Sequence, residues 1–235
     1  MKHFTKYGAL EDTVYSQVNN PSEEQIRKDD IEDRAKITAF LRDAKISEAI
    51  ISKAMQAMGG YLETCGPTAA TMGVHAIGKL GTFECPGFYS PQPEQIAADW
   101  FNDPRNYAMM RKIRPETDPA AWAGNRIPQF YPAMIKDVFG VTAIFAWDKS
   151  YEYISKWILE NFSFLACFKE SMLKKVPGHF FTVVGFDDQT GNIIYNDPWP
   201  GNYYPARYLE TSAMNRELTQ AEWQENVEGY TVRIG

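Results

Sequence analysis

Apolar and polar residues follow two different periods along this chain, and the change between them divides it into two parts. Before about residue 140, apolar residues recur at the three- and four-residue spacing of helices, interrupted by stretches rich in Pro and aromatic residues. After residue 141, short apolar runs separated by turn residues are typical of β-strands. Helices followed by antiparallel strands predict an α+β fold.

Residues 1–45 are expected to form a helical N-terminal extension. After an irregular start of about 20 residues, Asn20 is predicted to cap a helix, with Pro21 as its first residue and Glu23 three positions after the cap. The charged helix that follows has only a narrow apolar stripe, so it is predicted to lie outside the core. A second helix is predicted over residues 47–58, where a Gly pair ends it.

The segment that begins at Cys65 is rich in small residues and predicts a central, closely packed helix. Pro67 is tolerated in its first turn, and Gly78 or Gly81 is expected near its end. Residues 81–132 are rich in Pro and aromatic side chains. This composition predicts loops and short helices, which often shape a binding cleft.

The last third of the chain is predicted to form a sheet. Its expected strands, in chain order, are 141–147, 162–168, 180–186, 192–195 and 229–234. A helix is expected between the first two strands, and Thr219 with Glu222 forms a capping box for a short helix near the end. We therefore expect one domain after the extension, with a mainly helical half, 46–140, and a mainly β half, 141–235.

Composition and charge narrow the class of protein. The 235 residues are 44% hydrophobic and 23% charged, as in an ordinary globular protein, and the formal net charge of −6 argues against a nucleic-acid partner. No apolar run approaches the roughly 20 residues of a membrane-spanning helix. The start lacks the pattern of a secretory signal, so a cytoplasmic location is the default expectation unless a leader has been removed. The oligomeric state is left open by the sequence.

Three cysteines, Cys65, Cys85 and Cys167, supply the first candidate chemistry. They cannot all pair, and their spacing matches no zinc-finger pattern, so we expect neither a disulfide framework nor a bound cofactor or metal. Cys85 is interpreted as a loop or buried residue and Cys167 as a core residue. Cys65 is either a small buried residue or a nucleophile.

The position of Cys65 favours a nucleophile for a physical reason. Free backbone N–H groups and the helix dipole at a helix N-terminus stabilise a thiolate. The main-chain N–H of Cys65 could also donate to an oxyanion, and Gly66 allows a substrate carbonyl to approach closely.

A cysteine nucleophile normally needs a histidine base, and His179 is the best placed of the three histidines. His3 lies in the irregular start, and His75 is about 15 Å from Cys65 along the same predicted helix. Asp197 follows the second strand of the predicted hairpin and would share the face of His179 in one of the two strand registers. Without the cysteine, a satisfied His and a turn Asp would be the favoured explanation of this pair.

Three short motifs together resemble a known family. Cys65-Gly66-Pro67-Thr68, then GHFFTVVGFD at 178–187 and NDPW at 196–199, resemble the papain-like cysteine peptidases related to the bacteriocin-processing, double-glycine leader peptidases. The resemblance spans about residues 50–235. It implies a papain-like fold, in which a helical half carrying the nucleophile packs on an antiparallel β-sheet half.

The resemblance also implies roles for single residues. Cys65 would be the nucleophile, His179 the general base and acid, and Asp197 the residue that orients the imidazole. Trp199 would either shield the His-Asp pair from water or serve as a packed aromatic residue.

One position departs from the family pattern. The family places a glutamine six residues before the cysteine as an oxyanion donor, and this chain has Gly59 there. Gln56 could take the role if the residues between it and Cys65 form a bulged loop; otherwise it is an exposed helix residue. Loss of such a donor costs on the order of 3 kcal/mol of transition-state stabilisation.

These observations support a cysteine peptidase or amidase that works through a Cys-His-Asp triad and a thioester acyl-enzyme. An acyltransferase or cross-linking enzyme of the same fold, a non-catalytic peptidase-like binding protein, and a metal site built from Cys65, His179 and Asp197 remain alternatives. The expected partner is a peptide or protein substrate, with a cell-wall peptide among the candidates, selected by the aromatic-rich segment 83–131. The N-terminal extension could cover the cleft.

Overall fold

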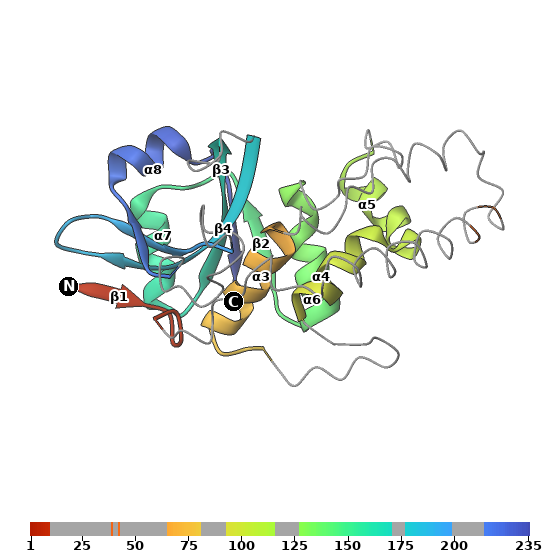
Figure 1. The fold of residues 1–235 in the computed structure, drawn as a ribbon, viewed down its shortest axis with the longest axis horizontal. Helices are drawn as coiled ribbons and strands as arrows, with labels where there is room; N and C mark the ends of the chain where they lie inside the picture. The colour runs from red at the N-terminus through yellow and green to blue at the C-terminus, as the bar shows by residue number, and fades with distance from the viewer. Residues whose placement is uncertain are drawn as a thin grey trace, which may run out of the picture.

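The computed structural model describes residues 1–9, 39, 42, 65–80, 93–115, 127–170, 177–198 and 214–235. Its strands form one antiparallel sheet, and its helices lie around that sheet (Figure 1). The predicted α+β class is therefore confirmed. The predicted helices before residue 65 and the domain boundary at residue 45 lie almost wholly outside the described residues and stay predictions, although Ala39 and Arg42 are helical.

The sheet of the described residues has the strand order β2-β7-β3-β4-β5-β6, with β1 paired to β4. In chain order the strands are β1 (Lys2–Phe4), β2 (Ala143–Ala146), β3 (Ser163–Glu170), β4 (Pro177–Asp187), β5 (Ile193–Asn196), β6 (Arg216–Leu218) and β7 (Thr231–Ile234). All five strands predicted for the last third are confirmed. The short strands β1 and β6 were not predicted.

Strand β1 corrects the prediction of an irregular start. Lys2 pairs with Asp187 and Phe4 with Gly185 in an antiparallel register. After the strand, the Thr5 N–H donates to the carbonyl of Val184 at 2.8 Å. The first residues thus belong to the sheet and not to a separate helical extension.

The helices divide into two groups on the two sides of the sheet. They are α3 (Cys65–Ala76), α4 (Pro93–Asn102), α5 (Tyr107–Ile113), α6 (Tyr131–Phe139), α7 (Tyr151–Leu159) and α8 (Gln220–Asn226), with 3₁₀ turns η3 (Pro104–Asn106) and η6 (Pro128–Phe130). Figure 1 shows α4, α5 and α6 grouped beyond α3, away from α7 and α8. None of the described helices is long and apolar enough to cross a membrane.

Helix α3 is the central buried helix that its small residues predict. Every residue of α3 except Cys65 and His75 is buried. The helix is tied to the sheet by the hydroxyl of Ser163, which donates to the Gly73 carbonyl at 2.8 Å, and by the hydroxyl of Thr182, which donates to the Ala69 carbonyl. Small side chains permit this close approach, so the N-terminus of α3 has a fixed position relative to β3 and β4.

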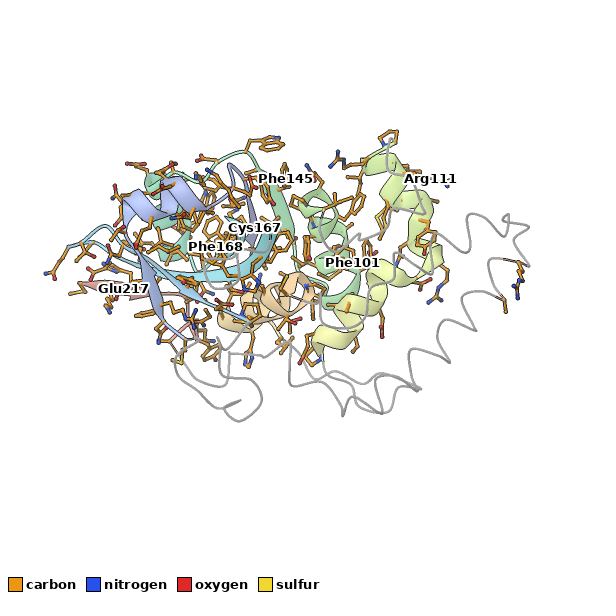
Figure 2. All side chains as sticks on the ribbon, turned by 45° about the horizontal axis from the view of Figure 1, so that its top comes forward. Phe101, Arg111, Phe145, Cys167, Phe168 and Glu217 are labelled. Atoms are coloured by element: carbon orange, nitrogen blue, oxygen red, sulfur yellow. The ribbon has the colours of Figure 1, made fainter. Side chains whose placement is uncertain are left out.

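Strands β3 and β4 are apolar without alternation because both faces of the sheet are covered. One face packs on α3, α4 and α6 through Leu165 and Cys167, and the other packs on α7 and α8 through Phe164 and Phe168. Figure 2 shows Phe101 among the helices of the first group, and Cys167 and Phe168 within the sheet. The two clusters hold the sheet between two layers of helices.

Most of the described aromatic residues expected to line a cleft are core residues, although Tyr107 is only partly buried. Trp100, Phe101, Phe130 and Tyr131 are all buried in the cluster around α3. The composition of this segment indicated short helices correctly, but aromatic content does not distinguish a core contact from a substrate contact.

Candidate active site

Cys65 is the first residue of α3, at the position that the sequence predicts. Its side chain is partly exposed and packs against the core cluster around α3. The N–H groups of the first helical turn have no partner four residues earlier within the helix, so they and the helix dipole favour negative charge there. Cys65 therefore lies at the end of α3 where the helix favours a negatively charged group.

His179 lies near the start of β4, directly after Gly178. Gly178 has φ +72°, a conformation that an L side chain rarely adopts, so glycine is required at this turn into the strand. The imidazole is parallel to the ring of Phe168, with a centroid distance of 6.4 Å, and Phe168 stacks on Phe181 at 4.2 Å. His179 and Phe181 therefore share one strand face, as predicted.

Asp197 lies next to His179 because of the register of β4 and β5. Thr182 pairs with Asn196, which places the following residue, Asp197, at the level of Phe181. Of the two registers that the sequence left open, this is the one that aims the carboxylate at the imidazole. His179 Nε2 lies 2.6 Å from Asp197 Oδ1, and only 2% of the Asp197 side chain is exposed.

The three candidate residues act on one another electrostatically. Burial lowers the pKa of the His179 imidazolium, but hydrogen bonds with Asp197 and Cys65 and their negative charges outweigh burial and raise this pKa to about 10. The contribution of Cys65 requires its side chain to lie within interaction range of the ring. The arrangement favours an imidazolium held between a carboxylate and a thiolate.

Asp197 has a second partner that the sequence did not predict. The guanidinium of Arg216 donates through Nη1 to Asp197 Oδ2 at 3.2 Å. Arg216 is the first residue of β6 and pairs with Tyr195 of β5. Its place depends on a three-residue strand without an apolar run, which leaves no signal in the sequence.

Cys167 is a core residue, as predicted. Burial raises the pKa of its thiol to about 12, although a hydrogen bond with Tyr230 opposes this shift. Cys167 therefore carries a neutral thiol at neutral pH and is a poor nucleophile.

The other two histidines lie away from the site. His3 Nε2 is 2.9 Å from Asp188 Oδ2, and its ring stacks on Phe186 at 4.7 Å, near the opposite end of β4 from His179. His75 lies in the last turn of α3, at the other end of the helix from Cys65. Neither histidine is placed to act as the base.

Several assignments lie outside the described residues. Gln56, Gly59, Cys85 and Trp199 are among them, so the oxyanion donor and the shielding aromatic stay predictions. Within the described ranges, no group of three or more His, Cys, Asp or Glu side chains could hold a metal ion. The metal alternative thus has no geometric support there.

The chain matches the model of a known family. The model of a family described as the Peptidase_C39 like family matches residues 49–227, more than half of the chain. The comparison with curated proteins finds no relative. The match covers α3, the β4–β5 hairpin and the residues that carry the resemblance seen in the sequence. The chain therefore belongs to the Peptidase_C39 like family and is related to the papain-like cysteine peptidases.

Proposed function

We propose that this protein is a cysteine peptidase or amidase in which Cys65, His179 and Asp197 form a catalytic triad. The observation that carries the proposal is the 2.6 Å contact between His179 Nε2 and Asp197 Oδ1, on a ring whose pKa is also raised by Cys65. Because Asp197 occupies Nε2, Nδ1 is the ring nitrogen left to exchange a proton with the thiol.

The first half of the reaction forms an acyl-enzyme. The Cys65 thiolate attacks the substrate carbonyl and forms a C–S bond, while the proton of the thiol resides on His179. The main-chain N–H of Cys65 donates to the oxyanion. When the C–N bond breaks, His179 gives its proton to the leaving amine, and a thioester remains on Cys65.

The second half of the reaction is hydrolysis. Neutral His179 takes a proton from a water molecule as its oxygen attacks the thioester carbonyl. The C–S bond then breaks, the acyl group leaves as a carboxylic acid, and His179 returns its proton to the sulfur or keeps it opposite the thiolate. Asp197 holds the same tautomer in both halves and stabilises the imidazolium.

The proposed substrate is a polypeptide or a cell-wall peptide. The core contains Trp100, Phe101 and Tyr131. Contacts of the aromatic-rich segment with substrate would therefore come from its other residues.

Analysis of products in the presence of an added amine distinguishes hydrolysis from acyl transfer. A peptidase gives the free carboxylic acid, and an acyltransferase gives a new amide.

Replacing the nucleophile tests the proposal directly. In Cys65→Ala, peptide hydrolysis and rapid labelling by iodoacetamide at neutral pH should both be abolished, because no other described thiol is activated. Cys167→Ala is the matched control and should keep the labelling, because its thiol has a pKa of about 12. Peptide hydrolysis retained by a folded Cys65→Ala variant would contradict the assignment of Cys65 as the nucleophile.

A further inference from the structure

Arg216 approaches the candidate triad from its far side. Asp197 is held at both carboxylate oxygens, by His179 at Oδ1 (2.6 Å) and by Arg216 at Oδ2 (3.2 Å). The Asp197 side chain is 2% exposed and that of Arg216 is 22% exposed. Water therefore reaches the guanidinium but hardly reaches the carboxylate.

Hydrogen bonds hold the backbone just before β6. Asn215 has φ 51°, a left-handed conformation that is uncommon for a residue other than glycine. Its N–H donates to Asn196 Oδ1 at 2.8 Å, and the buried Asn196 side chain donates to the Gly8 carbonyl at 3.3 Å. These bonds hold Asn215, the residue before Arg216, beside Asn196, the residue before Asp197.

The proposed reaction is favoured by a group next to Asp197 that stays positively charged throughout. During the proposed cycle His179 is an imidazolium at some steps and neutral at others. A buried carboxylate is unfavourable without a positive partner, because burial disfavours the charged form. The guanidinium of Arg216 gives the Asp197 carboxylate such a partner at the steps where His179 is neutral.

Other titratable groups of the described residues near this ion pair do not supply that charge. Besides His179, they include Tyr195 on β5, Cys65 on α3 and, close to Tyr195, Glu222 on α8. Burial raises the pKa of Tyr195 to about 12 in spite of its hydrogen bond with Arg216. Glu222 accepts hydrogen bonds from Thr219 in the capping box.

We propose that Arg216 is a positioning residue of the site, which gives the Asp197 carboxylate a lasting positive partner and keeps it oriented toward His179 through the whole cycle. This inference rests on the proposed function. It predicts that loss of Arg216 weakens the thiolate of Cys65 through Asp197 and His179.

The test measures the rate of alkylation of Cys65 by iodoacetamide against pH, with the modified residue identified by mass spectrometry. In Arg216→Gln, the midpoint of the acid limb should move up by on the order of one pH unit, because a positive charge is lost and the Asp197 carboxylate no longer has its second partner to hold it toward His179. Arg216→Lys should restore most of the wild-type profile. Arg105→Gln removes an arginine of a surface ion pair with Asp103 and should leave the profile unchanged.

A double-mutant cycle separates action through Asp197 from general support of the fold. In an Asp197→Asn background, Arg216→Gln should change the alkylation rate by less than about twofold, because an amide needs no counter-ion. An equal, additive loss in both backgrounds would overturn the inference. If Arg216→Gln does not fold, Arg216→Met, which also removes the charge and keeps a long side chain, replaces it in the same cycle.

The outcomes also separate this inference from the proposed function. A wild-type Cys65 that titrates like an ordinary thiol, with a pKa of about 8.5, contradicts the proposed function itself. An acidic thiol in the wild type whose profile is the same in Arg216→Gln overturns only the role of Arg216.

Discussion

At the scale of single residues, the charge of His179 links the candidate site to the stability of the fold. Its pKa rises from 6.5 to about 10 because hydrogen bonds and charges from Asp197 and Cys65 outweigh burial. A pKa raised on folding adds stability that is fully present below about pH 6.5 and is lost as the pH rises through 10.

This linkage gives a prediction for unfolding. The free energy of unfolding in urea, measured from pH 6 to 10, should fall more steeply for the wild type than for His179→Gln, by up to about 1.4 kcal/mol per pH unit. His75→Gln is the control and should keep the wild-type slope, since His75 lies at the other end of α3. Equal slopes for the wild type and His179→Gln would mean that the imidazole is not held as a cation.

The sequence predicts single residues best where each carries its own local signal. Cys65 precedes a glycine and a proline at a helix start, and His179 follows the glycine that turns into β4. The direction of the Asp197 side chain could be predicted only from the pairing register of the two hairpin strands. The sequence left this register open, and a one-residue slip reverses the face of every side chain. Arg216 has no local signal, since only the pairing of β6 with β5 brings it to Asp197.

At the scale of elements, long apolar runs were predictable and three-residue strands were not. Strands β3 and β4 have runs of buried apolar side chains, whereas β1 and β6 have the sequences KHF and REL. Their place in the sheet is fixed by pairing with neighbours distant in sequence. The irregularity in β4 between Val183 and Gly185 is likewise visible only in the register of β4 with its partner β5.

The pairing of β1 with β4 can be tested at Gly185. A Cβ at this position would clash with the carbonyl oxygen of His3 and lie 3.0 Å from Phe4 Cδ1. Gly185→Ala should therefore displace β1 and lower the free energy of unfolding by about 1–3 kcal/mol. Gly229→Ala is the control, because a Cβ there meets no atom within 4 Å. Equal stability of the two variants in urea would contradict the pairing.

At the scale of the whole molecule, the candidate site lies where the helical half meets the sheet. Helix α3 supplies Cys65, β4 supplies His179, and the turn after β5 supplies Asp197. The sequence predicted the α+β class because helical spacing of apolar residues is followed by strand-like runs. This spacing does not show which helix packs against which strand, so it did not predict that these three elements lie close together. The hydrogen bonds that Ser163 and Thr182 donate to α3 are part of the packing that brings these elements together.

The first residues also change the interpretation of the N-terminal segment. Removing residues 1–45 would delete β1 and its bonds to β4, so a change in activity would not by itself reveal an uncovered cleft. A deletion that keeps residues 1–9 is the sharper test of a covering role. Higher peptidase activity after that deletion supports the role, and unchanged activity contradicts it.

The central claim is that Cys65 forms a covalent acyl-enzyme that His179 helps to hydrolyse. The most direct measurement is intact-mass and peptide-level mass spectrometry after the protein reacts with a peptide p-nitrophenyl ester and is quenched in acid. The account predicts an acyl adduct on Cys65 that turns over in the wild type, persists in His179→Gln and is absent in Cys65→Ala. An adduct on another residue, or turnover of the ester by a folded Cys65→Ala variant at the wild-type rate, would contradict it.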